Sequence, residues 1–174
     1  RLWERKRGGK NLSNHRVMIP KIIHYCWFGG NPLPKSAQKC IRSWKKYFPD
    51  YEIKEWNEQN FDVNSNRYTQ EAYERKKYAF VSDYARFYIL YQYGGVYFDT
   101  DVEVIKPMDD LLEKGAFMGI EQAESNLGVN PGLGFAVPAQ LPIFKEILDH
   151  YNAITFVDEN GKLDFEAIEE RVKK

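Results

Sequence analysis

The stretch from Ala79 to Asp101, AFVSDYARFYILYQYGGVYFDTD, carries the pattern of a helix, a stop and a strand in immediate succession. Residues 79–93 are apolar or aromatic on nearly every helical face, and a helix that is apolar all round is buried. Gly94-Gly95 predicts the end of that helix, and residues 96–98 form a short apolar strand pattern. A buried helix that leads directly into a buried strand predicts a layered α/β domain.

The same periodicity analysis extends to both sides of this stretch. We expect strands over residues 21–27, 51–56, 96–98, 102–106, 116–121 and 134–137, and helices over 36–48, 68–77, 79–93, 143–151 and 165–172. Strands that alternate with helices in this way indicate α/β layering.

Composition excludes several classes of protein. The 174 residues are 43% hydrophobic and 29% charged, as in a folded globular chain rather than a disordered one. No apolar run reaches the ~18 residues of a membrane span, and none forms the core of a signal peptide. The two cysteines build no disulfide framework and indicate a reducing compartment. We therefore expect a cytoplasmic location, with peripheral association at the inner face of a membrane as an alternative.

Charge divides the chain into two unequal parts. Residues 1–17 hold six basic residues and one acid, so the remaining 18–174 carry a net charge of −5. An acidic domain argues against nucleic acid as its main partner. We interpret 1–17 as a loose or artificial leader, with a basic arm that contacts anionic lipid as the alternative, and 18–174 as the domain.

Asp99 and Asp101 are the first candidate site residues. In extended backbone, residues two apart point to the same side, so the two carboxylates can converge on one hard cation. Mg²⁺ or Mn²⁺ fits, because these ions take a few protein carboxylates and complete their shell with substrate phosphate and water. An acidic, solvated turn is the alternative for this pair taken alone.

Asp83 and Arg86 add charge to the buried helix. They are three residues apart and share one helical face, and buried charge is costly unless it is paired or bonded. The pair is either an internal ion pair or a ligand contact, with Arg86 on a phosphate or sugar oxygen and Asp83 on sugar hydroxyls.

Further candidates lie at the ends of strands. Trp27 ends the first strand before a glycine loop, where its indole either stacks on a nucleotide base or packs in the core. Gly95 and Asn130 are candidate donor-binding residues, Asn130 because it opens a glycine-rich turn at 130–134 that lets backbone approach a sugar. An EF-hand is excluded, since the sixth position from Asp99 is valine rather than glycine.

Three motifs in order resemble one known family. Residues 22–30 (IIHYCWFGG), 82–86 (SDYAR) and 94–101 (GGVYFDTD) resemble the DXD-containing sugar-transferase family. That family includes initiating α-1,6-mannosyltransferases, bacterial capsular polysaccharide enzymes and, more distantly, the glucosylating domains of large clostridial toxins. The likeness extends from about residue 18 to 137.

The resemblance implies a GT-A fold with a mixed central sheet flanked by helices, a nucleotide-sugar donor, a divalent cation and retention of anomeric configuration. By position, Trp27 resembles the base-stacking residue, Asp83 and Arg86 the sugar and phosphate contacts, and Asp99 and Asp101 the acids that hold ribose and metal. Family members also carry a late His or Asn followed by Ser-Trp, which is missing here. We therefore expect 18–174 to be the N-terminal, donor- and metal-binding part of a longer domain.

The predicted function is transfer of a hexose from a nucleotide-diphosphate sugar to a carbohydrate or glycolipid acceptor, in capsular or surface polysaccharide biosynthesis. Arg86, Asp99 and Asp101 are the predicted catalytic residues. Two alternatives from other classes remain: a non-catalytic nucleotide-sugar-binding module and a metal-dependent phosphohydrolase.

Overall fold

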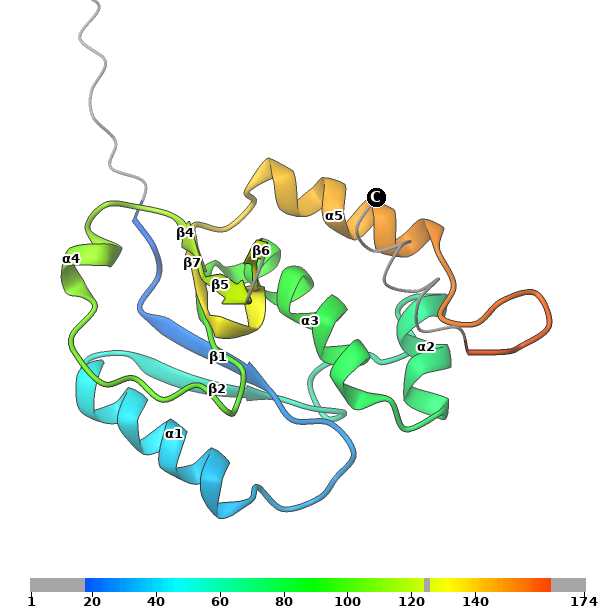
Figure 1. Ribbon diagram of the computed structural model, residues 1–174, viewed down its shortest axis with the longest axis horizontal. Helices are drawn as coiled ribbons and strands as arrows, with labels where there is room; N and C mark the ends of the chain where they lie inside the picture. The colour runs from blue at the N-terminus through cyan, green and yellow to red at the C-terminus, as the bar shows by residue number, and fades with distance from the viewer. Residues whose placement is uncertain (1–17, 124–125, 164–174) are drawn as a thin grey trace, which may run out of the picture.

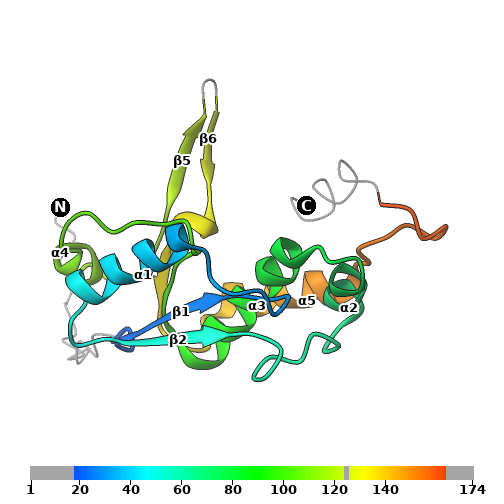
Figure 2. The ribbon, with the colours of Figure 1, turned by 90° about the horizontal axis from the view of Figure 1, so that it is seen from below.

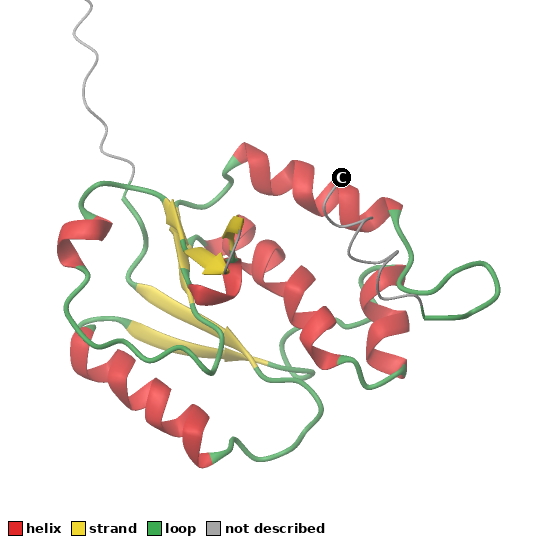
Figure 3. Ribbon diagram, in the orientation of Figure 1, coloured by secondary structure: helices red, strands yellow, loops and turns green. Residues whose placement is uncertain are grey.

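The computed structural model describes residues 18–123 and 126–163, and Figure 1 shows their arrangement. In chain order the elements are β1 (Ile22–Cys26), α1 (Lys35–Tyr47), β2 (Glu52–Trp56), α2 (Arg67–Glu74), α3 (Tyr78–Tyr93), β3 (Gly95–Tyr97), α4 (Asp109–Leu112), β4 (Phe117–Met118), β5 (Ile120–Ala123), β6 (Asn126–Val129), the 3₁₀ turn η1 (Pro131–Leu133), β7 (Phe135–Val137) and α5 (Pro142–Ala153). Figure 3 shows how helices enclose the strands on both sides. The predicted α/β class with a mixed sheet is confirmed.

Five strands form the central sheet in the order β2-β1-β3-β7-β4. β1 lies parallel to both β2 and β3, whereas β7 runs antiparallel to β3 and β4. The carboxyl ends of β1, β2 and β3 therefore meet at one edge of the sheet, which is where open α/β sheets bind ligands. β5 and β6 form a separate two-stranded hairpin, which Figure 2 shows projecting from the body of the molecule.

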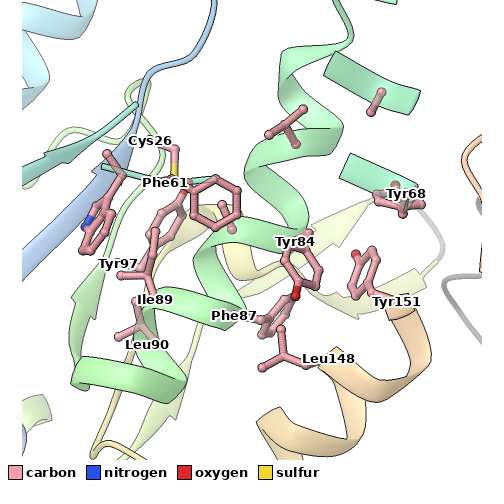
Figure 4. Packing of buried hydrophobic residues seen from close by; sticks show 14 of the residues in the cluster. Cys26, Phe61, Tyr68, Tyr84, Phe87, Ile89, Leu90, Tyr97, Leu148 and Tyr151 are labelled. Atoms are coloured by element: carbon pink, nitrogen blue, oxygen red, sulfur yellow. The ribbon is translucent and has the colours of Figure 1, made fainter. Parts of the chain in front are cut away.

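Side chains of the sheet alternate between two hydrophobic cores. Ile23 and Tyr25 face α1, in a core that also contains Trp44. Cys26 and Tyr97 face α3, in the larger core that α2 and α5 complete. Figure 4 shows that larger core at close range, including side chains of α3 packed against the end of α5. This period of two follows from the pleat of the strands.

The junction of α3 and β3 requires glycine. The amide of Gly94 donates to the carbonyl of Leu90 at 2.8 Å as the helix ends. Gly95 has φ +115°, and a Cβ built there would lie 2.6 Å from the carbonyl oxygen of Ile22 on β1. The two glycines therefore bring β3 close against β1 immediately after the helix.

Two strand predictions are wrong in detail. Residues 102–106 form no strand, because their backbone groups bond to α1 instead: the Trp44 indole donates to the Val102 carbonyl at 2.8 Å, and the Val104 amide donates to Ser43 Oγ at 2.9 Å. Residues 116–121 divide at Gly119 between β4 and β5, which belong to different sheets.

Three short elements, α4, β6 and η1, were not predicted from the sequence. They span only three or four residues each, too few for a periodic pattern to be recognised. The predicted helix at 165–172 and the leader at 1–17 lie outside the described residues.

Candidate functional site

A cavity of about 370 Å³ lies where β1 and β3 end and α3 begins. Trp27 and Asn31 contribute to it from the loop after β1, Asp83 from the second turn of α3, and Asp99 and Asp101 from the segment after β3. The structure thus brings together four of the predicted site residues from three separate parts of the chain, at the sheet edge where a ligand is expected.

Asp99 is held in place by its neighbours. Its Oδ1 accepts a hydrogen bond from the Tyr97 hydroxyl at 2.8 Å, and its amide donates to the Gly132 carbonyl at 3.2 Å. A Cβ built on Gly132 would lie 2.3 Å from Asp99 Oδ2, far inside van der Waals contact. The turn at 130–134 therefore needs glycine because it packs against the Asp99 carboxylate.

Burial and charge both act on this carboxylate. Burial raises the pKa of Asp99, the Tyr97 hydrogen bond and the Arg86 guanidinium oppose that rise, and the negative charge of Asp101 adds to it. Asp101 itself is exposed at the rim of the cavity. A bound cation would relieve the repulsion between the two acids.

Asp83 and Arg86 form an ion pair on α3, with Arg86 Nη2 3.1 Å from Asp83 Oδ1. The Arg86 side chain is only 11% exposed, and its Nε has no hydrogen-bond partner among the described residues. Burial raises the pKa of Asp83, with a smaller contribution from Asp99, and the Arg86 charge counteracts the rise. Asp83 faces the cavity at Asp99, whereas Arg86 lines a neighbouring cavity between α3 and α5.

The loop after β1 fixes the position of Trp27. The indole Nε1 donates to the Asn31 carbonyl at 2.6 Å and leaves the ring half-buried at the cavity wall. Gly29 has φ +98° and packs against the Tyr78 ring, and its amide donates to Glu58 Oε1 at 2.5 Å. An indole whose Nε1 is fixed in this way, with its ring half-buried at the cavity wall, can present one face to a flat ring.

Gly95 and Asn130 lie outside this cavity. Gly95 is buried in β3, where it permits the close approach to β1. Asn130 Oδ1 accepts from the Gly132 amide at 2.9 Å, and its Nδ2 donates to Glu121 at 2.9 Å. The geometry gives both residues structural roles, and their assignment to donor binding stays a prediction.

Sequence reasoning missed two residues that shape the site, Tyr97 and Gly132. Tyr97 could have been found, because it lies two residues before Asp99 and so on the same side of an extended chain. Gly132 could not, since its contact with Asp99 joins segments more than thirty positions apart.

The donor atoms suit a hard divalent cation. Asp99 and Asp101 offer carboxylate oxygens, and residues 18–123 and 126–163 hold no cluster of three or more His, Cys, Asp or Glu side chains that could complete a metal site. Mg²⁺ and Mn²⁺ accept such partial sites, because substrate phosphates and water complete the coordination. The cavity therefore fits a cation that is held jointly with a phosphorylated ligand.

The central mixed sheet flanked by helices is a fold of the GT-A type, and it is shared with a solved structure. A PaToxG glycosyltransferase structure matches 75% of this chain and 59% of its own, with a TM-score of 0.56 and 20% identity. The fold is thus shared at low sequence identity. Among the helices of the described residues, none is both long and apolar enough to span a membrane.

Sequence comparisons name the family. Residues 34–118 match the glycosyltransferase sugar-binding region containing the DXD motif, and this chain belongs to that family of glycosyltransferases. Inositol phosphoceramide mannosyltransferase 3 of Schizosaccharomyces pombe is 33% identical over 129 residues, covering 71% of this chain and 35% of the relative. Mannosyl phosphorylinositol ceramide synthase SUR1 of Saccharomyces cerevisiae is 30% identical over 150 residues, covering 80% and 37%. The chain thus spans just over a third of the length of these relatives.

Proposed function

We propose that residues 18–174 form the donor- and metal-binding part of a retaining hexosyltransferase. The enzyme would transfer a hexose from a nucleotide-diphosphate sugar to a glycolipid or carbohydrate acceptor in surface-glycan assembly, with a cytoplasmic location. The observation that carries this proposal is that Trp27, Asp83, Asp99 and Asp101 line one and the same cavity. The names of two relatives, one a mannosyltransferase and the other a mannosyl phosphorylinositol ceramide synthase, favour mannose as the hexose.

Each side chain has a distinct task in this proposal. The Trp27 indole stacks on the nucleobase. The Asp83 carboxylate accepts hydrogen bonds from hydroxyls of the donor sugar, and Arg86 positions Asp83 through their ion pair. Asp99 and Asp101 would hold Mn²⁺ or Mg²⁺, which neutralises charge on the departing diphosphate when it is bound.

The reaction exchanges one bond to the anomeric carbon for another. The bond from that carbon to the diphosphate oxygen breaks, the nucleoside diphosphate leaves, and the acceptor hydroxyl oxygen forms the new bond while its proton passes to the leaving phosphate. The protein contributes by orienting the donor and by keeping the acids that bind the cation close together.

Ligand-induced stabilisation tests the proposal directly. We expect a nucleoside-diphosphate hexose and Mn²⁺ to raise the melting temperature together, by more than the sum of their separate effects. A ligand at a hundred times its Kd adds about 2.7 kcal/mol to the free energy of unfolding. Asp101→Asn should remove the joint effect, whereas Asp110→Asn, at an exposed position of α4, should retain it.

Two outcomes would contradict the proposal. Equal stabilisation of both variants by the donor and Mn²⁺ would show that Asp101 does not bind them. Release of inorganic phosphate rather than free sugar from the donor would instead indicate a phosphohydrolase. In the full-length enzyme, glycosyl transfer distinguishes a transferase from a non-catalytic binding module.

A further inference from the structure

The exposed face of α1 is strongly basic. The helix carries five basic residues and no acid in thirteen positions. Four of them, Lys35, Lys39, Arg42 and Lys46, are spaced at i, i+4, i+7 and i+11 and are all exposed. At about 100° per residue these four positions fall within an arc of about 60°. We call these four residues the basic stripe.

The basic stripe points directly away from the sheet. The buried residues of α1 are Ala37, Cys40, Ile41 and Trp44, which lie on the opposite side of the helix. At about 1.5 Å per residue the stripe is about 16 Å long. Only Lys39 pairs with an acid of the described residues, Glu103, at 3.0 Å. The stripe is therefore a row of largely uncompensated positive charge on a domain that is acidic as a whole.

Apolar side chains accompany this charge. A groove of about 330 Å³ separates α1 from residues 103–105, and Lys39, Arg42 and Lys46 line it together with Ile105. Ile105 is 76% exposed. The β5–β6 hairpin also projects on the side of the sheet that α1 covers (Figure 2), and its register places the exposed Ile120, Leu127 and Val129 on one face.

The side chains of this surface favour one class of anionic partner over another. Nucleic-acid sites use arginine forks and aromatic stacking, whereas three of the four stripe residues are lysines, which act as point charges. A diffuse layer of anionic headgroups attracts such charges without fixed geometry, and apolar side chains enter the interface beside them. We propose that α1, with Ile105, is a docking surface for an anionic membrane.

The geometry links this surface to the candidate active site. Asp101 at the cavity and Ile105 beside the stripe belong to one short segment. Hydrogen bonds with the side chains of Trp44 and Ser43 join this segment to α1. Docking through α1 would therefore hold the cavity close to the bilayer, where the head of a lipid-anchored acceptor can reach it. The docking surface itself does not depend on the proposed reaction.

Vesicle binding tests the inference. The chain is sedimented with phosphatidylcholine vesicles and with vesicles in which about a third of the lipid is phosphatidylserine. We expect binding to the anionic vesicles alone, weakened by salt. Neutralising three stripe residues (Lys35→Gln, Arg42→Gln and Lys46→Gln) should weaken it roughly 100-fold, since each basic residue near such a surface changes affinity about five-fold.

The matched control removes the same charge elsewhere. Lys76→Gln, Lys145→Gln and Lys162→Gln change exposed lysines at positions outside α1. The six basic residues of 1–17 are identical in both triple variants, so the difference between the variants reports α1 alone. Equal binding by the two triple variants would overturn the inference.

Ile105→Ser separates a membrane from a nucleic acid. We expect it to weaken vesicle binding several-fold with no change in net charge. Unchanged vesicle binding by Ile105→Ser, together with stripe-dependent binding of a single-stranded RNA oligonucleotide, would refute a membrane partner. All these measurements omit nucleotide sugar and Mn²⁺, so their failure is distinguishable from failure of the proposed transferase function.

Discussion

Replacing Gly132 by alanine introduces one methyl group at the most crowded point of the candidate site. The new Cβ would lie 2.3 Å from Asp99 Oδ2 and 3.1 Å from Asn130 Oδ1. The carboxylate must therefore move by about 1 Å to reach ordinary van der Waals separation. Gly132 does not adopt a positive φ, so the effect is steric and not a matter of backbone strain.

The displacement has a calculable effect on binding. It breaks or lengthens the 2.8 Å hydrogen bond from Tyr97 that holds Asp99 in place. In the proposed complex the displaced carboxylate also loses its own contact with the ligand, and a contact of this kind to a charged group contributes about 1.5–3 kcal/mol. Metal ligands must also keep their distances within about 0.2 Å. We therefore expect the Mn²⁺-dependent affinity for a nucleoside-diphosphate hexose to fall by about 10- to 100-fold.

Isothermal titration of the donor with and without Mn²⁺ measures this change. Gly128→Ala is the matched control, because no atom lies within 4 Å of a Cβ built there. It should bind the donor as the unmodified chain does. Wild-type affinity in Gly132→Ala, with its fold intact by circular dichroism, would refute the reasoning that the position of Asp99 governs metal and donor binding.

Three further predictions concern stability and specificity. His24 accepts a hydrogen bond from the Trp56 indole at 3.0 Å, and burial lowers the pKa of His24 from 6.5 to about 4. As the pH falls, the unfolded chain therefore binds a proton at His24 before the folded chain does. The free energy of unfolding should fall by up to about 3 kcal/mol between pH 6.5 and 4. Urea denaturation should show this loss in the unmodified chain and a smaller one in His24→Gln, and identical slopes would contradict it. Glu71 Oε2 accepts hydrogen bonds from the amides of Phe156 and Val157 at 2.9 and 3.1 Å. Glu71→Gln should therefore lower the free energy of unfolding by about 1–3 kcal/mol in the same assay. An unchanged free energy of unfolding would show that these bonds between α2 and the segment after α5 do not stabilise the fold. Arg86→Lys should weaken donor binding, because lysine lacks the planar guanidinium whose Nη2 pairs with Asp83. Unchanged affinity in a titration of the donor would show that Arg86 does not position Asp83.

The fold class could be predicted from the sequence because it follows from patterns among residues that are close together in the chain. The apolar and aromatic residues on nearly every face of 79–93 predicted a buried helix, and α3 is that helix. The alternation of 51–56 predicted a half-buried strand, which is β2. Residues 102–106 were misassigned for a physical reason. Their β-branched residues, Val102, Val104 and Ile105, predict a strand, but the hydrogen-bond partners of this segment came from α1 instead of another strand.

The candidate site could be predicted from such patterns only in part. Asp99 and Asp101 share a side through the period of an extended chain, and Asp83 and Arg86 through that of a helix. Only the tertiary structure shows that Asp83 and Arg86 line different cavities. Which side chains of a helix meet a ligand depends on the elements packed around it, and no local pattern contains that information.

The sequence by itself determined the longer helices, the first strands of the sheet, the acid pair and the likeness to the DXD glycosyltransferases, because each depends on residues close together in the chain. Tertiary structure decided that Gly132 supports Asp99, that Gly95 and Asn130 lie outside the cavity, and that Asp101 and Ile105 share one segment fastened to the basic helix. These contacts join positions far apart in the chain. They exist only once the two hydrophobic cores have fixed the sheet between α1 and α3.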